Sequence, residues 1–420
     1  MPQTKNLKKN LNFKSGFPLV GVLGAGQLGR MLALAGYPLG IQFRFLDLAP
    51  NSPAGQVAQA ITGDFRDEAT LQSFIEGVDV VTYEFENAPL ETAEWIASRI
   101  PVFPPPIALK TAQDRLNEKN LFKRLGIETP CFAPVSSLNE LHVACAEIGF
   151  PAVLKTRRLG YDGKGQWILN SLDESIQIWE EIEKDHVGEP ISLILEGFIR
   201  FDREISIIAA RSRTGETACY PLFENQHQGG ILRVTKSPAP DISLRLATQA
   251  THAMTSILDA LDYVGVLTIE FFVCEDRLIA NEIAPRVHNS GHGTIEGNEC
   301  SQFENHLRAI LGFPLGDVAP KGTSMMWNLL GEAPLTQDIL SIPRTYLHLY
   351  GKEERPGRKI GHVTLLGESA AELNDRFESV KKMAPQSELG KKIGCIAVEK
   401  IGLHPLSQQP NPTGFPRKAN

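Results

Sequence analysis

The sequence predicts an α/β domain with a parallel sheet at the N-terminus, followed by α+β modules. Two observations favour this fold class. From residue 18 onward, short apolar runs alternate with a glycine-rich turn and helical stretches, which is the pattern of strand–helix–strand units in a parallel sheet. Farther along, several β-like runs follow one another before the next long helix, which favours an α+β arrangement.

Composition excludes several classes of protein. At about 150 residues per domain, a chain of 420 residues has two to four domains. Hydrophobic residues make up 42% and charged residues 22%, so the chain is not disordered, collagen-like or a coiled coil. No apolar stretch approaches the roughly 18 residues that a membrane-spanning helix needs, and a net charge of −7 gives no support for nucleic-acid binding. Six scattered cysteines without a C-x-x-C pair suggest neither disulfides nor zinc, and fit a reducing, cytoplasmic location.

The elements of the first domain follow from its periodicity. Apolar runs predict strands, and the stretches between them predict helices. Pro101 and the prolines at 104–106 mark the domain boundary. The expected strands are 19–23, 41–46 and 78–83, and the expected helices run from 27 to about 37 and over 89–100.

The rest of the chain predicts mixed α and β structure. We expect helices at 113–125, 172–184 and 241–260; strands at 151–155, 166–169, 192–199, 204–211, 217–222 and 231–235; a hairpin of 264–273 with 278–283; and strands at 345–350 and 362–366 that close a small final module. The expected domains are a disordered tail (1–16), a Rossmann-like domain (17–112), a small α+β domain with a glycine-rich flap (113–190), a domain with paired carboxylates (191–340), a small C-terminal module (341–403) and a second disordered tail (404–420).

The first glycine-rich turn, G-x-G-x-x-G at 24–29, follows a strand and is succeeded by Asp47, as in dinucleotide-binding domains. Its glycines would let main-chain amides approach a phosphate at the helix N-terminus. Close packing of helix on strand requires the same glycines. A nicotinamide site, a phosphate site for another ligand and a purely structural turn all remain open.

The second glycine-rich loop, 155–166, is more informative. Lys155 ends a strand and precedes a turn with three glycines and several cations. Mobile amides and fixed positive charges suit a triphosphate, although the loop is not a Walker A sequence. A basic hairpin exposed to solvent is the alternative.

Two glutamates flank the predicted hairpin. If the turn centres on Asp276, Glu270 and Glu282 lie opposite each other on one face. Facing carboxylates repel unless a cation lies between them, and Mg²⁺ prefers such oxygen ligands together with phosphates. Asn281 would then point to the other face, or reach the site through a local irregularity. A one-residue change of register would separate the two carboxylates.

Two further loops are rich in polar side chains. Residues 284–293 combine hydrogen-bonding side chains with glycines, which favours a binding loop. His288 and His292 lie among Gly and Pro, so a helical zinc pair is not favoured. The basic loop 352–362 could hold a phosphate, or be a charged turn between strands.

These motifs together resemble the ATP-grasp superfamily. Within it, the segments at 26–31 (GQLGRM), 160–166 (GYDGKGQ), 281–292 (NEIAPRVHNSGH) and 355–362 (RPGRKIGH) are similar to the 5-(carboxyamino)imidazole ribonucleotide synthases of purine biosynthesis. The similarity covers about residues 18 to 400. It implies an ATP-grasp fold with a Rossmann-like N-terminal domain and a small C-terminal β module.

The resemblance also implies an activity, that of an ATP-dependent carbon–nitrogen ligase. ATP would phosphorylate bicarbonate to carboxyphosphate, and the amine of 5-aminoimidazole ribonucleotide would take up the carboxyl group, with release of ADP and phosphate. Mg²⁺ (or Mn²⁺) would bridge the ATP phosphates. Such an enzyme is expected to be a cytoplasmic homodimer with small-molecule substrates and no nucleic-acid or membrane partner.

The resemblance assigns residues one by one. Glu270 and Glu282 match the metal ligands, and the catalytic candidates are Lys155, Arg286 and His288, the last as a guess for the general base. The ATP contacts would be Arg115, Lys155, Gly160, Tyr161, Asp162, Gly163, Lys164, Gly165, Gln166, Glu196, Gly197, Phe198, Ile199, Glu204, His227, Asn281 and Glu282. The ribonucleotide contacts would be Gln27, Tyr161, Asp162, Arg286, His288, Asn289, Ser290, Lys352 and Arg358.

Some of these assignments carry a mechanistic expectation. Lys352 and Arg358 would hold the 5′-phosphate, and Tyr161 with Asp162 would belong to a loop that closes over both substrates. Lys164 stands where other members carry arginine, which preserves charge but not the fork geometry.

Three alternatives remain. Another ATP-grasp ligase, such as a formate-dependent glycinamide ribonucleotide transformylase, would share the fold. A nicotinamide dehydrogenase would explain the first glycine loop but not the second loop or the paired glutamates. A non-catalytic nucleotide-binding subunit is disfavoured because Lys155, Glu270 and Glu282 are all present.

Overall fold

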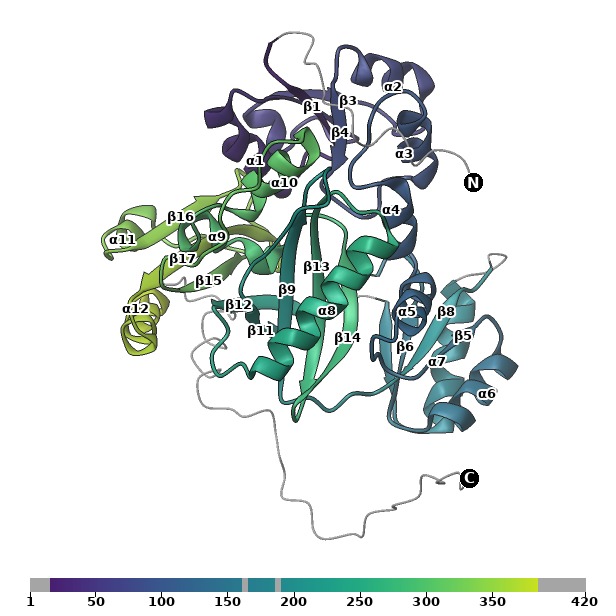
Figure 1. The fold of residues 1–420 in the computed structure, drawn as a ribbon. Helices are drawn as coiled ribbons and strands as arrows, with labels where there is room; N and C mark the ends of the chain where they lie inside the picture. The colour runs from purple at the N-terminus through teal and green to yellow at the C-terminus, as the bar shows by residue number, and fades with distance from the viewer. Residues whose placement is uncertain (1–15, 161–164, 186–189, 384–420) are drawn as a thin grey trace.

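A computed structural model describes residues 16–160, 165–185 and 190–383. Their strands form three sheets: a four-stranded sheet β3-β2-β1-β4, a second four-stranded sheet β5-β8-β6-β7, and a nine-stranded sheet β14-β13-β9-β11-β12-β15-β17-β16 with β10 beside β9. Figure 1 shows the first sheet at the top, the second at the lower right and the large sheet between them and at the left. The three sheets carry the α/β and α+β architecture predicted from the sequence.

The N-terminal sheet is parallel throughout, as predicted. Its third strand and second helix escaped the sequence analysis, because that strand has only four residues and none of them is fully buried. The elements are β1 (Leu19–Leu23), α1 (Gln27–Gly36), β2 (Gln42–Asp47), β3 (Gln59–Thr62), α2 (Glu68–Ile75), β4 (Val80–Tyr83) and α3 (Leu90–Ala97), with 3₁₀ turns at Tyr37–Leu39 and Ala54–Gln56.

Two helices lead from this domain to the small sheet. Asp114 caps the second of them, accepting from the main-chain N–H of Leu116, and Gly126 follows its end in a left-handed conformation. The elements are α4 (Pro106–Ala112), α5 (Arg115–Arg124), β5 (Phe132–Val135), α6 (Leu138–Ile148), β6 (Ala152–Thr156), β7 (Gln166–Leu169), α7 (Leu172–Asp185) and β8 (Leu193–Gly197).

The large sheet is antiparallel, and α8 packs on β9, β13 and β14 while α10 packs between β9, β13 and α1. The predicted strand 217–222 is shorter in the structure and ends at Cys219, before Pro221, which cannot donate a ladder hydrogen bond. The elements are β9 (Arg203–Arg211), β10 (Thr217–Cys219), β11 (Phe223–Gln228), β12 (Ile231–Ser237), α8 (Leu244–Ala260), β13 (Gly265–Cys274), β14 (Arg277–Ala284), a 3₁₀ turn (Asn289–Gly291), α9 (Thr294–Gly297) and α10 (Gln302–Leu311).

The C-terminal strands continue the large sheet. We expected 345–350 and 362–366 to close a module of their own, but β17 pairs with β15, and β15 pairs with β12. The sheet therefore runs across residue 340, where we had placed a domain boundary; the domain limits themselves stay predictions. The elements are β15 (Thr323–Leu330), α11 (Thr336–Leu340), β16 (Thr345–Leu349), β17 (Lys359–Gly367) and α12 (Ala370–Lys382).

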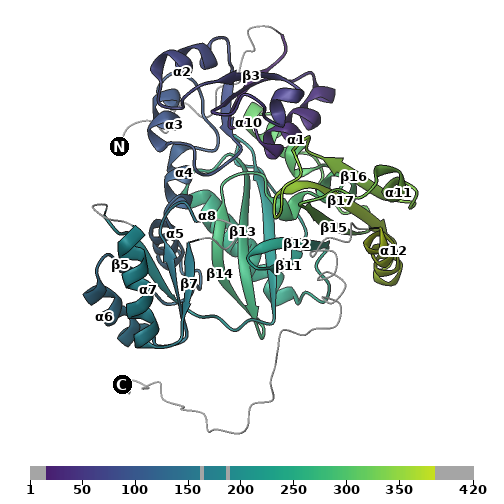
Figure 2. The same cartoon turned by 180° about the vertical axis from the view of Figure 1, so that it is seen from behind.

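The far edge of the large sheet matters most for the site. β14 is its edge strand, and α5 packs against it on the side away from β13. Figures 1 and 2 both show α5 between β14 and the small sheet. Among the described residues, no helix combines the length and apolarity needed to cross a membrane.

Candidate active site

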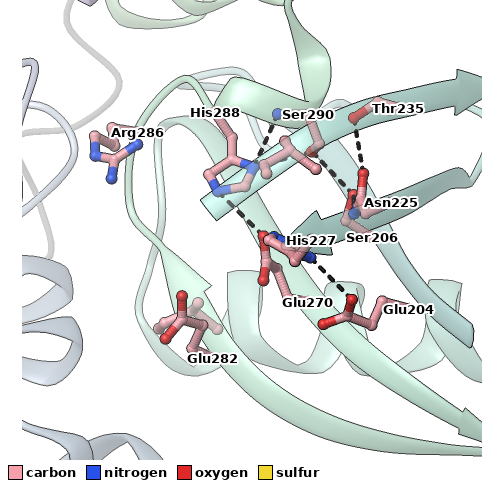
Figure 3. A network of polar contacts seen from close by, with 12 residues as sticks. Glu204, Ser206, Asn225, His227, Thr235, Glu270, Glu282, Arg286, His288 and Ser290 are labelled. Carbon is pink, nitrogen blue, oxygen red and sulfur yellow. Dashed lines mark hydrogen bonds and ion pairs between the residues drawn. The ribbon is translucent and has the colours of Figure 1, made fainter. Parts of the chain in front are cut away.

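Four neighbouring strands of the large sheet bring acidic and imidazole side chains together. Figure 3 shows Glu204 from β9, His227 from β11, Glu270 from β13 and Glu282 from β14 on the same side of the sheet. The sequence predicted each of these residues for the site. The sheet unites them because neighbouring strands place side chains of the same register on one face.

Glu270 and Glu282 are direct cross-strand partners, as predicted. A β-bulge on β14, next to Glu270 in the ladder, leaves Asn281 as the extra residue between Ala280 and Glu282. Burial raises the pKa of Glu270 to about 7, and the charges of Glu282 and Glu204 act in the same direction against the lowering effect of His227. Of the two alternatives for Asn281, the structure has the local irregularity. The two carboxylates repel each other.

His227 supplies a positive charge beside these carboxylates. Its Nδ1 lies 2.9 Å from Glu204 Oε2. Burial lowers the pKa of His227, but the Glu204 hydrogen bond and the charges of Glu270, Glu204 and Glu282 outweigh it and raise the pKa to about 9. At neutral pH His227 is a cation facing an acidic site.

A buried chain of hydrogen bonds holds His288 (Figure 3). Thr235 donates to Asn225 Oδ1 at 3.0 Å, and Asn225 Nδ2 donates to Ser206 Oγ at 2.9 Å. Ser206 donates in turn to Ser290 Oγ at 2.9 Å, and Ser290 Oγ lies 2.9 Å from His288 Nδ1.

This chain fixes the tautomer of His288. The main-chain N–H of Ser290 donates to Nδ1, and the Ser290 hydroxyl proton is free for the same atom because its oxygen accepts from Ser206. Burial, with Arg286 nearby, lowers the pKa of His288 well below its usual value, so the ring is neutral and its proton is on Nε2, 3.3 Å from Glu270 Oε1. Both nitrogens are engaged, so this geometry favours positioning of Glu270; the general-base role stays a prediction.

Lys155 lies one residue before the end of β6 and forms an ion pair with a carboxylate on β8. Its Nζ lies 2.9 Å from Glu196 Oε2, an atom that Lys119 Nζ also approaches at 3.3 Å. Burial would raise the pKa of Glu196, but the two lysines lower it to about 2. Glu196 Oε1 is buried without a hydrogen-bond partner among the described residues. The predicted nucleotide residues Lys155 and Glu196 therefore touch each other.

Helix α5 reaches the edge of the carboxylate pair with three side chains. Arg115 Nη1 lies 3.1 Å from Glu282 Oε2, as expected for a residue of this site. Glu118 and Lys119 were not predicted. Glu118 Oε1 accepts from the main-chain N–H of Ile283 at 2.6 Å, and Lys119 Nζ donates to the carbonyl of Asn281 at 2.7 Å.

A second cluster joins the N-terminal domain to the loops at 286–290 and 352–358. Lys352 Nζ donates to Gln27 Oε1, and Arg286 Nε pairs with Glu86. Burial and the charge of Arg358 lower the pKa of Lys352 to about 8. Both polar side-chain atoms of Asn289 are buried without a partner in the described part of the chain. Four predicted ribonucleotide residues, Gln27, Arg286, Asn289 and Lys352, thus belong to this cluster.

The first glycine-rich turn is occupied by the protein itself. The main-chain N–H groups of Gly26 and Gly29 donate to Glu84 at 2.5 and 2.8 Å, and that of Ala25 donates to Asp47 at 2.8 Å. Carboxylates therefore accept the hydrogen bonds that a dinucleotide phosphate would need. Of the three explanations for this turn, the structure favours the structural one and disfavours a nicotinamide site.

The second glycine-rich loop lies only partly within the described residues. Tyr161, Asp162, Gly163 and Lys164 are outside them, as are residues 1–15 of the first predicted tail and all of the second. Gly165 adopts φ +70° and its carbonyl accepts from Thr156 at 2.8 Å, which places Gln166 at the start of β7 beside Lys155. Gly197 ends β8, and Phe198 after it is 39% exposed. Gly160 and Ile199 lie in the loops next to these elements.

The side chains at the carboxylate pair supply only part of a metal site. Within the described ranges, no three His, Cys, Asp or Glu side chains gather in a group that could hold a metal by themselves. Two facing carboxylates remain, and their repulsion is relieved by a cation. Mg²⁺ commonly binds one or two carboxylates together with nucleotide phosphates, so the residues fit a site that a nucleotide completes.

Three domain families match the chain in succession. The ribonucleotide synthetase preATP-grasp domain matches residues 18–113, the ATP-grasp domain matches 120–303, and the phosphoribosylaminoimidazole carboxylase C-terminal domain matches 324–376. The N5-carboxyaminoimidazole ribonucleotide synthase of Pseudomonas aeruginosa is 48% identical over 366 residues, which are 87% of this chain and 99% of that protein. The chain belongs to the N5-carboxyaminoimidazole ribonucleotide synthase family.

Solved structures of this family superpose on the chain. That of N5-carboxyaminoimidazole ribonucleotide synthetase from Thermus thermophilus is 50% identical with a TM-score of 0.82, covering 88% of this chain and 99% of the other. The synthase from Aspergillus clavatus, in complex with ADP and 5-aminoimidazole ribonucleotide, is 32% identical with a TM-score of 0.79, covering 87% and 99%. The predicted ATP-grasp fold is confirmed.

Four charged residues around this candidate site were missed by the sequence analysis: Glu84, Glu86, Glu118 and Lys119. Glu84 and Glu86 directly follow the predicted strand 78–83, and charged residues at the carboxyl end of a parallel strand are a known signal for a site. Glu118 and Lys119 gave no such signal, because a Glu–Lys pair inside a predicted helix is typical of a solvated face.

Proposed function

We propose that this chain catalyses the ATP-dependent carboxylation of 5-aminoimidazole ribonucleotide by bicarbonate, through carboxyphosphate, to give N5-carboxyaminoimidazole ribonucleotide, ADP and phosphate. The observation that carries the proposal is the Glu270–Glu282 pair with Arg115 and His227 close to it, in a chain that matches nearly the whole Pseudomonas aeruginosa synthase. Paired carboxylates and cations of this kind suit the transfer of a phosphoryl group.

The ATP site lies between the small sheet and the large one. Lys155 carries a fixed positive charge at the end of β6, beside the start of the second glycine-rich loop. Glu196 Oε1, which has no hydrogen-bond partner among the described residues, is a buried acceptor suited to the amino group of adenine. Glu204 and His227 form the opposite wall, where Glu204 suits a ribose hydroxyl.

Glu270 and Glu282 would hold Mg²⁺ against the nucleotide phosphates. When bound, Mg²⁺ supplies charge stabilisation for the transferred phosphoryl group. The chain's own part is to hold both carboxylates in place and aimed at one point. Arg115 contacts Glu282, and the neutral His288 directs its Nε2–H toward Glu270.

The ribonucleotide site lies in the cluster around Lys352 and Arg286. Lys352 and Arg358 would hold the 5′-phosphate as cations. Gln27 contacts Lys352, and Glu86 orients the Arg286 guanidinium beside the loop of Asn289. Asn289 offers a side-chain donor and acceptor, both without a partner in the part of the chain that the structure describes, and these suit the imidazole substituents.

Four expectations from the sequence belong to this proposal as predictions. They are bicarbonate as the carboxyl donor, Mn²⁺ as an alternative metal, a homodimer and a cytoplasmic location. The same holds for the roles given to single residues.

The proposal is tested by ADP release with Mg-ATP and bicarbonate, with and without 5-aminoimidazole ribonucleotide. We expect strong stimulation by the ribonucleotide that depends on bicarbonate. Stimulation by glycinamide ribonucleotide and formate instead would keep the ATP-grasp chemistry and overturn the substrate. Absence of ADP release under all these conditions would contradict a catalytic role.

A further inference from the structure

The outer edge of β14 is paired with side chains of a helix. An edge strand normally exposes its main-chain N–H and C=O groups to solvent or to another strand. Here the carbonyl of Asn281 accepts from Lys119 at 2.7 Å, and the N–H of Ile283 donates to Glu118 at 2.6 Å. Both side chains are buried, with relative exposures of 0% for Lys119 and 2% for Glu118.

These two contacts lie on either side of Glu282, at the bulge. From the turn upward, the hairpin pairs Cys274 with Arg277 and continues regularly to Phe271 with Ala280. An unbroken ladder would next pair Glu270 with Asn281. The bulge inserts Asn281, so that Glu282 takes the place opposite Glu270. A one-residue slip exchanges the faces of a strand, so holding the bulge is equivalent to holding the Glu282 carboxylate in the site.

Lys119 extends this support to the small sheet. Its Nζ lies 3.3 Å from Glu196 Oε2, the atom that also pairs with Lys155. One ammonium group therefore joins the edge of β14 to the end of β8. Desolvation of such charges is costly, and well-packed apolar side chains would often give equal or greater stability. A consecutive Glu–Lys pair buried at this place therefore indicates that the two side chains position the strand beside them.

We propose that Glu118 and Lys119 are positioning residues: they lock the bulge at Asn281 so that Glu282 faces Glu270, and they tie this carboxylate pair to the Lys155–Glu196 ion pair. The inference rests on the proposed function, which takes the carboxylate pair as the place where Mg²⁺ meets the nucleotide.

The test compares four variants with the wild-type chain. Lys119→Met removes the donors with little change of volume, and Glu118→Leu removes the acceptor. Burial raises the pKa of Glu118 to about 8, so Glu118→Gln imitates the neutral acid and keeps an oxygen for Ile283. Lys123→Met is the matched control, because Lys123 is an exposed residue of the same helix.

Two measurements are made on each variant. The first is the Mg²⁺ enhancement, which is the ratio of the ADP affinities measured by calorimetry with and without Mg²⁺. Effects of a substitution on adenine binding cancel in this ratio. The second is amide hydrogen exchange of the segment 278–284. We expect Lys119→Met and Glu118→Leu to lose about 10- to 100-fold of the Mg²⁺ enhancement, as supporting residues of metal sites do. They should also exchange faster at 278–284, whereas Glu118→Gln and Lys123→Met stay close to wild type.

The outcomes separate the inference from the proposed function. Folded Lys119→Met and Glu118→Leu variants with wild-type Mg²⁺ enhancement and exchange would overturn the inference and leave the function standing. A wild-type chain without any Mg²⁺ enhancement would contradict the metal site of the proposed function, while the exchange data would still decide whether the pair holds the bulge. If Lys119→Met does not fold by circular dichroism, the difference between Glu118→Leu and Glu118→Gln decides.

Discussion

Glu270 lies directly opposite Glu282 in the β13–β14 hairpin, although the turn of that hairpin would by itself pair Glu270 with Asn281. Residues Glu275 and Asp276 form the turn between the paired Cys274 and Arg277. The bulge at Asn281 corrects the register by one residue. The acidic pair is therefore a product of an irregularity, and the residues that support the bulge are part of the site.

Glu270→Gln and Glu282→Gln should each weaken the Mg²⁺ dependence of nucleotide binding. An amide keeps the shape of the side chain but removes the charge that offsets a divalent cation. We expect a loss of about 10- to 100-fold in Mg²⁺ affinity, by titration in the presence of ADP. Glu275→Gln, in the exposed turn of the same hairpin, is the control. Equal Mg²⁺ affinities for all three variants would contradict the metal assignment.

Lys155→Ala should reduce turnover with little effect on folding. The variant loses the ammonium group proposed to face the phosphates, while Lys119 still pairs with Glu196. Loss of one electrostatic contact to a transition state costs about 100- to 1,000-fold in kcat, which the ADP-release assay would detect. Near-normal turnover would rule out the phosphoryl role, and Lys123→Ala serves as the exposed lysine control.

The ribonucleotide site should lose affinity at alkaline pH. The pKa of Lys352 is lowered to about 8, so its charge is complete below that pH and is lost as pH rises through it. We expect kcat/KM for 5-aminoimidazole ribonucleotide to fall above about pH 8, since this parameter follows ionisations of the free enzyme. Lys352→Arg should move the fall to higher pH, because arginine stays charged. Superimposable pH profiles of the two enzymes would show that Lys352 is not the titrating group.

Gly26→Ala should destabilise the N-terminal domain. A Cβ at this position would collide with the Glu84 carboxylate that accepts from the Gly26 and Gly29 amides. Overpacking of this kind costs about 1–3 kcal/mol, measurable by urea unfolding. At Gly197, a Cβ would meet only ordinary contacts, the nearest at 3.6 Å, so Gly197→Ala is the control. If Gly26→Ala left the free energy of unfolding unchanged, the first glycine-rich turn would again be a candidate ligand site.

Periodicity was a good guide where burial follows a simple repeat. The strands of the parallel sheet at 19–23 and 41–46 were predicted because apolar runs bounded by glycine or polar residues mark a strand buried on both faces. β11 was missed, since its residues Phe223 to Gln228 are mostly polar and line the site instead of the core. The place of β16 and β17 in the large sheet was missed because strand pairing over a long sequence separation has no local signal.

By itself, the sequence determined the family and the parallel N-terminal sheet, and it singled out Lys155, Glu270 and Glu282 as candidates, because these follow from motifs and from repeats that are local in the chain. Only the tertiary structure decided that Glu118 and Lys119 are buried, that Glu84 occupies the first glycine turn, and that a bulge sets the hairpin register. The physical reason is the same in each case. A charged side chain can be buried when a distant main-chain group or ion is its partner. The tertiary fold decides which group that partner is, and the neighbouring residues in the sequence do not.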